Sequence, residues 1–204
     1  MKLHWSPKSP YVRKVMVCAH ELALLDQLEC VRSVAAMLEP NARLMQDNPL
    51  SKIPTLVLDD GSTLFDSVVI CEYLNMRANG TLFPERGSAK WAALRWHALA
   101  DGLLDVLILW RNERDRPPGE CSAALMQAFE HKTQATLQQL EHETDALRQA
   151  PFSIAHITLG CALGYLDFRF ESLAWRRQAP ALAAWYAELA ARPSFRHTEP
   201  TLAG

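Results

Sequence analysis

The sequence predicts an α/β domain followed by an all-α domain, joined by a short linker. Strand-like and helix-like patterns alternate through residues 1–78, and strand signals nearly vanish from residue 88 onward. Between these regions the stretch NMRANGTLFPERGS contains Asn, Gly and Pro, which are typical of loops. We therefore expect domains at residues 1–78 and 88–204, with the linker at residues 79–87.

The first domain opens with a strand, a helix and a second strand. Residues 2–5 alternate apolar and polar side chains, as a half-buried strand does. From Pro10 onward, the apolar positions 12, 15, 16, 19 and 22 fall on one face of a helix. Residues 28–31 fit a second short strand, so the order is that of an α/β domain.

A hairpin and a further helix complete this domain. Thr55–Leu58 and Thr63–Phe65 have strand composition and flank the sequence DDGS, where Asp and Gly suit a tight turn. Asp66 or Ser67 then caps a helix that runs through Leu74.

The second domain is predicted to be helical throughout. Long helices are expected at residues 88–114 and 123–148, and the first ends before the Pro-Pro pair at 117–118. Shorter helices fit residues 157–170 and 181–191.

Composition indicates an ordinary globular chain. The 204 residues are 49% hydrophobic and 22% charged, with a formal net charge of -2. This balance argues against nucleic-acid binding, and no run approaches the roughly 20 apolar residues of a membrane span.

The N-terminus lacks the apolar core of a signal peptide, which predicts a cytoplasmic protein. The five cysteines form no CxxC pair, so we expect reduced packing residues and no metal site.

Three motifs and the helical tail together resemble the soluble glutathione transferases. SPYVRKV is similar to the active-site segment at the start of that family's first helix, NPLSKIPTLVLDDG to the segment with its cis-proline, and LFDSVVICEYL to its glutathione-capturing acid and serine. SIAHITLGCALGYLDFRF followed by LAAWYAELAARPSF is similar to the helical domain of a bacterial branch. The resemblance implies an N-terminal thioredoxin-like domain, a C-terminal α-helical bundle domain, glutathione as co-substrate, and a homodimer that acts in detoxification.

Ser9 is the expected catalytic residue. As an N-cap with Pro10 at the first helical position, it lies at the positive end of the helix dipole beside unpaired backbone N–H groups. The resemblance implies that Ser9 stabilises the glutathione thiolate, whereas a simple helix cap is the alternative interpretation. Ser6 and Tyr11 are competing hydroxyls. Serine cannot form a mixed disulfide with glutathione, which favours conjugation, dehalogenation or peroxide chemistry over thiol-disulfide exchange.

The resemblance also implies the other glutathione contacts. A cis Ile53-Pro54 bond would turn the backbone groups of Ile53 outward, where they can pair with the cysteinyl residue of glutathione. Asp66 and Ser67 begin a helix that suits the γ-glutamyl ammonium and carboxylate, with a plain cap as the alternative. Lys52 and Arg13 are candidates to bind the second carboxylate of glutathione or to steer anions toward the site. For each, a solvated surface charge is the alternative interpretation.

The electrophile site is expected between the domains, along the segment DGLLDVLILWRNERDRP and opposite the start of the chain. The candidate lining residues are Trp5, Tyr11, Trp110, Arg111 and Arg114. Trp110 also continues a stripe with Leu103 and Leu107 that is typical of a helix core. The two arginines have acidic neighbours, so surface salt bridges are the alternative interpretation for them.

One position departs from the family pattern. The family usually has an aspartate where this chain has His156, and Ser153 followed three residues later by an acid forms an N-capping box. Imidazole accepts a hydrogen bond only through a neutral ring nitrogen, and a cation is unfavourable near a helix N-terminus. We therefore expect a weaker cap that loosens as the pH falls through the imidazole range.

The residues and the resemblance together predict a glutathione S-transferase that conjugates glutathione to a small hydrophobic electrophile. Two other classes of protein are compatible with the same motifs. One is a non-catalytic binding or interaction protein with this fold, and the other is a reductase or isomerase that uses glutathione as a cofactor.

Overall fold

The structure, a computed structural model of the chain, describes residues 1–202. It divides into two compact units. The first contains Met1–Phe83 together with the C-terminal segment that begins at Pro193, and the second contains Pro84–Arg192.

A four-stranded sheet forms the centre of the first unit. Its strands are β1 (Lys2–Trp5), β2 (Glu29–Arg32), β3 (Thr55–Val57) and β4 (Thr63–Leu64), and their spatial order is β2-β1-β3-β4. β1 and β2 are parallel, whereas β3 is antiparallel to both β1 and β4. The predicted strands are thus present, and no bound differs from the prediction by more than one residue.

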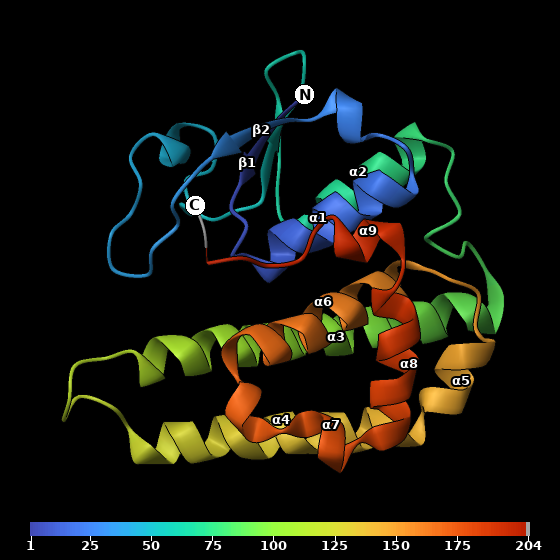
Figure 1. Cartoon of the computed structure of the whole chain (residues 1–204). Coiled ribbons are helices and arrows are strands. Elements are labelled where there is room, and N and C mark those ends of the chain that lie inside the picture. Colours follow the sequence, from blue (N-terminus) through green and yellow to red (C-terminus); the bar gives the residue numbers. More distant parts are fainter. Residues whose placement is uncertain (203–204) are drawn as a thin grey trace. The chain divides into compact units, whose positions relative to one another are not determined.

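Helices α1 (Pro10–Glu21) and α2 (Ser67–Arg77) pack against each other on one side of this sheet (Figure 1). Two short 3-10 helices, η1 (Leu25–Gln27) and η2 (Leu44–Gln46), lie in the connections between strands. The core is formed by the apolar faces of these elements, and its fully buried side chains include Leu3, Val15, Cys18, Leu56, Ile70 and Leu74. Burial of these faces fixes the helices against the sheet.

The C-terminal segment returns to the first unit, although the sequence places it with the helical domain. Its helix α9 (Pro193–Arg196) packs against α1. Phe195 is fully buried, and the Arg13 guanidinium donates a hydrogen bond to the Phe195 carbonyl at 3.2 Å. Ser194 donates from its hydroxyl to the Glu21 carboxylate at 2.5 Å. In the sequence, Pro193 indicates only the end of the preceding helix. It does not indicate the attachment to α1, because the bonded partners lie more than 170 residues away.

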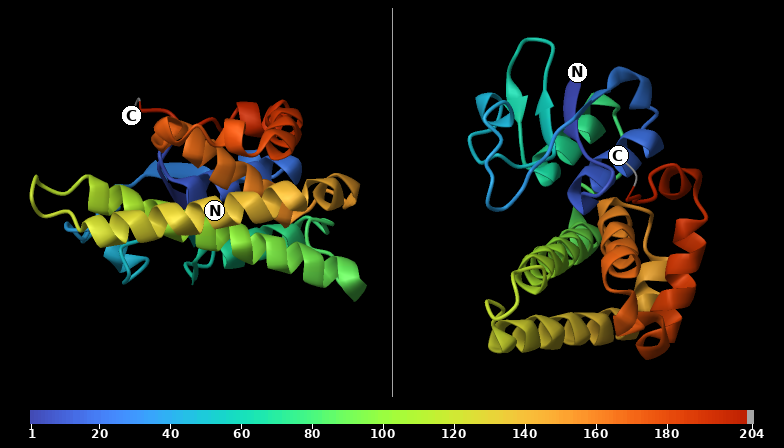
Figure 2. Two further views of the ribbon diagram at one scale, coloured as in Figure 1. Left: turned by 90° about the horizontal axis from the view of Figure 1, so that it is seen from below. Right: turned by 60° about the vertical axis from the view of Figure 1, so that its left-hand side comes forward.

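The second unit is helical in the part of the chain that the structure describes. Long helices α3 and α4 pack along each other, and α6 packs along α3 (Figure 2). Its helices are α3 (Gly87–Arg114), α4 (Ala123–His142), α5 (Thr144–Gln149), α6 (Ile154–Arg169), α7 (Trp175–Gln178) and α8 (Pro180–Ala190). α6 is buried from Ile154 to Leu166 and therefore forms the centre of this unit.

The predicted helix at residues 123–148 is two helices, because the chain breaks at Glu143 between α4 and α5. The Glu143 carboxylate accepts hydrogen bonds from the Arg95 guanidinium and the Trp96 indole of α3, each at 2.5 Å. Its partners are some 47 residues away, so the local pattern carries no sign of the break.

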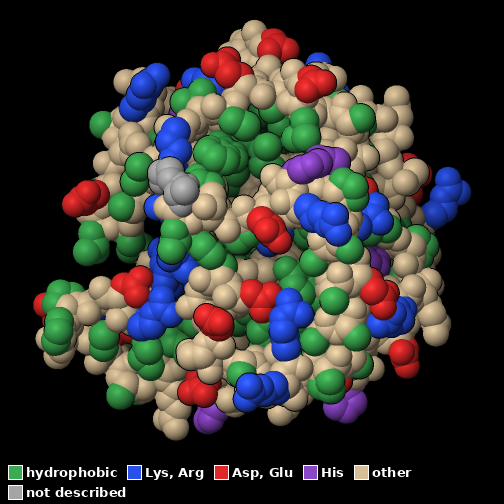
Figure 3. All heavy atoms as spheres, in the orientation of Figure 1, with side chains coloured by type: hydrophobic (Ala, Val, Ile, Leu, Met, Phe, Trp, Pro, Cys, Tyr) green, Lys and Arg blue, Asp and Glu red, His purple; other side chains and the backbone are tan. Residues whose placement is uncertain are grey.

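Charged side chains of both signs are interspersed over the face of the molecule shown in Figure 3, and neither sign dominates it. This distribution agrees with the net charge of -2. None of the described helices is both long and apolar enough to span a bilayer.

The buried position of α9 makes the C-terminal segment a structural part of the first unit. We expect Phe195→Ala to lower the free energy of unfolding by about 3–5 kcal/mol, as for other aromatic side chains removed from a core. Urea unfolding followed by circular dichroism measures the change. The matched control is Leu202→Ala, because Leu202 is 66% exposed and its loss should cost less than about 0.5 kcal/mol. Equal stabilities of the two variants would contradict this role of α9.

Candidate functional site

The strand pairing brings three motifs to one end of the sheet. Because β3 is antiparallel to both β1 and β4, the end of β1, the start of β3 and the end of β4 lie together. Ser9 follows β1, Ile53-Pro54 precedes β3, and Asp66 follows β4. The sheet thus gathers the motifs that the sequence singles out, although they are spread over more than 50 residues.

Ser9 is the N-cap of α1. Its backbone is extended (φ -88, ψ 120), its Oγ accepts a hydrogen bond from the Val12 N–H at 3.3 Å, and Pro10 occupies the first turn. A hydroxyl has two acceptor lone pairs and one donor proton, so the cap leaves the proton of Ser9 for another partner. No described residue accepts that proton. Capping and donation to an anion are therefore compatible roles for one side chain.

The competing hydroxyl of Ser6 belongs to the turn that leaves β1. Its Oγ accepts a hydrogen bond from the Lys8 N–H at 3.4 Å, and its carbonyl accepts one from the Ser9 N–H at 3.3 Å. Ser6 is buried, whereas Ser9 is half-buried. Tyr11 is half-buried in the first turn of α1, with the Lys14 ammonium 5.9 Å from its ring centre.

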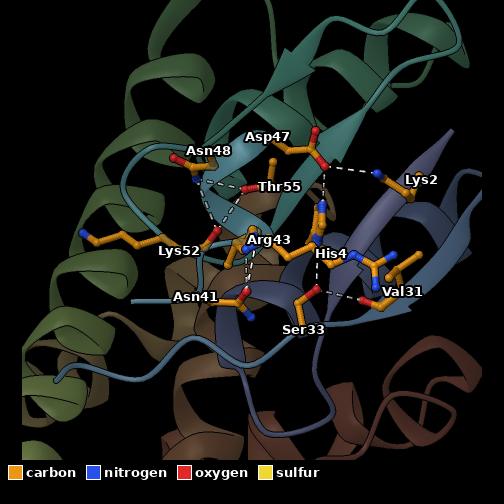
Figure 4. A network of polar contacts seen from close by, with 11 residues as sticks. Lys2, His4, Val31, Ser33, Asn41, Arg43, Asp47, Asn48, Lys52 and Thr55 are labelled. Carbon is orange, nitrogen blue, oxygen red and sulfur yellow. Dashed lines mark hydrogen bonds and ion pairs between the residues drawn. The ribbon is translucent and has the colours of Figure 1, made fainter. Parts of the chain in front are cut away.

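Arg13 does not lie on the surface, which contradicts its interpretation as a solvated charge. It is 6% exposed, donates to the Phe195 carbonyl, and has its guanidinium 5.6 Å from the centre of the Phe195 ring. These contacts hold α9 on α1. Lys52 is exposed, and its side chain points away from the neighbouring polar network in Figure 4.

The Ile53-Pro54 peptide bond is cis, as the resemblance implies. Pro54 is buried at the start of β3, and Ile53 is half-buried. In the described part of the chain, no hydrogen bond joins the backbone N–H or C=O of Ile53 to another residue. An unpaired donor and acceptor on one residue beside a strand can together bind an extended peptide.

Asp66 is the N-cap of α2. One carboxylate oxygen, Oδ1, accepts a hydrogen bond from the Val68 N–H at 2.9 Å, and the side chain is exposed. Ser67 is the first residue of the helix and is buried. The cap that the sequence offers as an alternative is thus present, and it occupies one of the two carboxylate oxygens.

A polar network that the sequence analysis missed lies beside these motifs (Figure 4). Asp47 accepts hydrogen bonds from Lys2 Nζ at 3.0 Å and from His4 Nε2 at 2.8 Å, and both donors are on β1. Hydrogen bonds from these partners lower the pKa of Asp47 below its ordinary value, that from His4 most. Asn48 anchors the segment before β3. The Asn-Pro pair at 48–49 is a turn signal, but its partners become known only with the strand register.

The candidate electrophile residues divide between the two units. Trp5 and Tyr11 are half-buried in the first unit. In the second, Trp110 is buried with its ring centre 4.9 Å from that of Phe170, as the core interpretation predicts. Arg111 donates to the Tyr165 hydroxyl at 3.3 Å, and burial raises the pKa of Tyr165 despite the nearby guanidinium groups. Arg114 forms an ion pair with Asp115 at 3.1 Å, which is the surface salt bridge of the alternative interpretation.

Comparisons with known proteins cover both units. The glutathione S-transferase N-terminal domain family matches residues 8–77, and the glutathione S-transferase C-terminal domain family matches residues 132–188. The uncharacterized GST-like protein YibF of Escherichia coli K12 is 31% identical over 203 residues, which cover 98% of each chain. The chain belongs to the glutathione S-transferase family.

Solved structures of this family agree with the fold. A glutathione transferase family member from Pseudomonas fluorescens Pf-5, solved with bound glutathione, is 44% identical, with a TM-score of 0.95 over 98% of this chain and 99% of that one. A glutathione S-transferase from Methylobacillus flagellatus KT, solved with GSH bound, is 38% identical, with a TM-score of 0.90 over 98% and 99% of the two chains. The thioredoxin-like N-terminal domain and the helical C-terminal domain are thus established.

His156 forms the capping box of α6 in this member of the glutathione S-transferase family. Its Nδ1 accepts a hydrogen bond from the Ser153 N–H at 3.2 Å, and its Nε2 donates to the Leu147 carbonyl at 3.0 Å. These two contacts fit the neutral ring with its proton on Nε2. The ring is 5% exposed. Burial lowers the pKa of His156, the Leu147 carbonyl opposes this, and the Arg192 charge lowers it further.

This cap should make stability depend on pH. Because the pKa of His156 is lower in the folded protein than in the unfolded chain, its contribution is complete above the unfolded value near 6.5 and is lost as the pH falls toward the folded value. We expect His156→Asp to remove this part of the slope of unfolding free energy as the pH falls below the unfolded value near 6.5. Urea unfolding at several pH values measures it.

The control for this experiment is His131→Asn, because His131 is an exposed histidine of α4. It should retain the slope of the parent protein. Parallel stability curves for the parent protein and His156→Asp would show that the cap is insensitive to pH.

Proposed function

We propose that this protein binds glutathione at the end of the sheet, stabilises its thiolate with Ser9, and conjugates it to a small hydrophobic electrophile. The observation that carries the proposal is the Ser9 hydroxyl, which caps α1 through its oxygen and keeps its proton available at that helix N-terminus. Two similar structures contain glutathione, which supports glutathione as the co-substrate.

Each part of glutathione has a matching group at this end of the sheet. The unpaired backbone of Ile53 would pair with the cysteinyl residue. The free carboxylate oxygen of Asp66 would bind the γ-glutamyl ammonium, and the N-terminus of α2 at Ser67 would bind its carboxylate. Lys52 is exposed and would attract the glycyl carboxylate. Arg13 is assigned instead to the attachment of α9, because its guanidinium is buried.

Thiolate stabilisation by Ser9 is sufficient for activation but not for most of the catalysis. Lowering a thiol pKa by about two units requires roughly 2.7 kcal/mol. A hydrogen bond to an anion contributes about 1.5–3 kcal/mol and a helix N-terminus about 0.3–1 kcal/mol. The thiolate fraction at pH 7 rises about 25-fold, but the lower basicity reduces nucleophilicity about 8-fold. The net gain is roughly threefold, so the larger contribution must come from orientation of the electrophile against the sulfur.

Candidate electrophile contacts are assigned in each unit by itself. Trp5 and Tyr11 offer half-buried aromatic surface in the first unit, and Arg111 and Arg114 offer guanidinium groups in the second. Aromatic surface suits an apolar electrophile, and a guanidinium group suits one that bears or develops negative charge. Trp110 packs against Phe170 in the core of the second unit.

A homodimer is part of the proposal. On α2, Val69 and Met76 are exposed although both are large and apolar, and on α3 the same holds for Trp91. Apolar side chains that recur on one helix favour contact with a partner surface. Analytical ultracentrifugation measures the expected dimer mass, and a monomer at micromolar concentration would contradict it.

The role of Ser9 is tested by the ultraviolet absorbance of the thiolate. With glutathione added at neutral pH, the parent protein should show a thiolate signal that Ser9→Ala largely removes, because the anion loses its hydrogen-bond donor. Ser9→Ala should also lose about 1 kcal/mol of stability as a cap, so the assay belongs well below the unfolding temperature.

Ser6→Ala is the matched control, since Ser6 is the other serine near this helix start, and it should keep the signal. A signal lost with Ser6→Ala and retained with Ser9→Ala would transfer the role to Ser6. Glutathione binding without conjugation of any electrophile in a broad panel would instead identify a non-catalytic binding protein. Glutathione recovered unchanged after turnover would identify an isomerase or a related enzyme.

A further inference from the structure

Asn48 is a buried polar residue that the proposed chemistry does not use. It follows η2 in the chain and is 1% exposed. Its Nδ2 donates hydrogen bonds to the Lys52 carbonyl at 3.2 Å and to Thr55 Oγ1 at 2.9 Å, and its Oδ1 accepts one from the Leu50 N–H at 3.0 Å (Figure 4). A buried amide with three partners is firmly held in one orientation.

Thr55 closes this arrangement into a triangle. Its hydroxyl accepts from Asn48 and donates to the same Lys52 carbonyl at 2.9 Å. Thr55 is fully buried in β3, where it lies opposite His4 of β1. The Lys52 carbonyl therefore has two side-chain donors, one from each side of the Ile53-Pro54 segment.

Fixing this carbonyl also fixes the direction of the Ile53 N–H. A peptide unit is planar, and in a trans peptide the N–H points opposite to the C=O. The Lys52-Ile53 bond is trans. With the carbonyl held toward Asn48 and Thr55, the Ile53 N–H points away from both side chains. This is the donor that has no partner among the described residues.

Asp47, the residue before Asn48, is attached to the sheet. It accepts from Lys2 and His4 of β1, and the other ring nitrogen of His4 lies 2.7 Å from Ser33 Oγ. These contacts attach the chain before Asn48 to the sheet. Asn48 is thus anchored through its neighbour to β1 and through its own side chain to the start of β3.

We infer that Asn48 and Thr55 are positioning residues for glutathione: they hold the Ile53 backbone in the orientation that pairs with the cysteinyl residue, without touching glutathione themselves. The inference rests on the proposed function. A backbone donor held before binding costs less conformational entropy when the ligand arrives, so the anchors act on affinity. Ser9 is untouched, so the rate of reaction of bound glutathione should change little.

We expect the loss of glutathione affinity in a variant to grow with the number of hydrogen-bond donors that the Lys52 carbonyl loses. Asn48→Asp is close in shape but replaces Nδ2 by an acceptor, which also draws the Thr55 hydroxyl away, so both donors are lost. Thr55→Val removes only the hydroxyl donor, and Thr55→Ser keeps it. We expect glutathione Kd to rise about tenfold for Asn48→Asp and about threefold for Thr55→Val, and to stay within about twofold for Thr55→Ser.

Asn75→Ala is the matched control for the loss of a buried amide. Asn75 lies in α2 of the same unit and is buried, and its side chain accepts a hydrogen bond from the Leu82 N–H at 2.9 Å, outside the segment around Ile53. It should lose stability and keep the parental glutathione affinity, because its effect is structural only.

Two measurements on the intact protein, at a temperature where every variant is folded, test the inference. Calorimetry gives glutathione Kd, and steady-state kinetics should show a raised KM for glutathione with little change in kcat. Amide hydrogen exchange of the peptide containing Ile53 should become faster in the order Thr55→Ser, Thr55→Val, Asn48→Asp.

Parental affinity in Asn48→Asp and Thr55→Val, as in Asn75→Ala, would overturn the positioning role and leave the proposed function intact. A loss of affinity in Thr55→Ser equal to that in Thr55→Val would also overturn it, because the hydroxyl would then be irrelevant. Absence of glutathione binding by the parent protein would overturn the proposed function, and this is measured before any variant.

Discussion

The antiparallel pairing of β3 with β1 and β4 is the constraint on which the candidate site depends. Leu3 of β1 lies opposite Leu56 of β3, and both are fully buried. A slip of one residue in this pairing would turn the apolar side chains of β3 out of the core, so burial fixes the register. The same register sets where Ile53-Pro54 lies with respect to Ser9 and Asp66. Side chains with no role in chemistry thus determine the geometry of the site.

Ser9 shows how a structural and a chemical role can share one side chain. The cap uses a lone pair of the oxygen, whereas stabilisation of an anion uses the hydroxyl proton. The serine that caps this helix therefore also places a hydroxyl donor at the helix N-terminus. Asp66 repeats the pattern, because one carboxylate oxygen caps α2 and the other is available to a cation. Helix starts at this sheet end therefore supply polar groups at little extra cost in stability.

Local signals in the sequence are enough to predict the strands of the first domain, the N-cap of α1 at Ser9, and the order of the motifs. Each depends on neighbours within a few residues. The break at Glu143, the attachment of α9 and the anchoring by Asn48 were not predicted. Glu143 and α9 depend on partners far along the chain, and Asn48 depends on a strand register that sequence patterns do not specify. The cis Ile53-Pro54 bond was expected only through the family resemblance, since base rates favour trans.

The return of the C-terminal segment to α1 has a consequence for how the chain is built during synthesis. The thioredoxin-like unit is discontinuous, because its last helix follows the entire helical unit in the sequence. A ribosome releases residues in order, and domains usually fold as they emerge. Here the buried guanidinium of Arg13 has no Phe195 carbonyl to bind until the segment after the helical unit has been translated. The unit that begins first is therefore the one completed last, and a chain truncated before Pro193 would leave it unfinished.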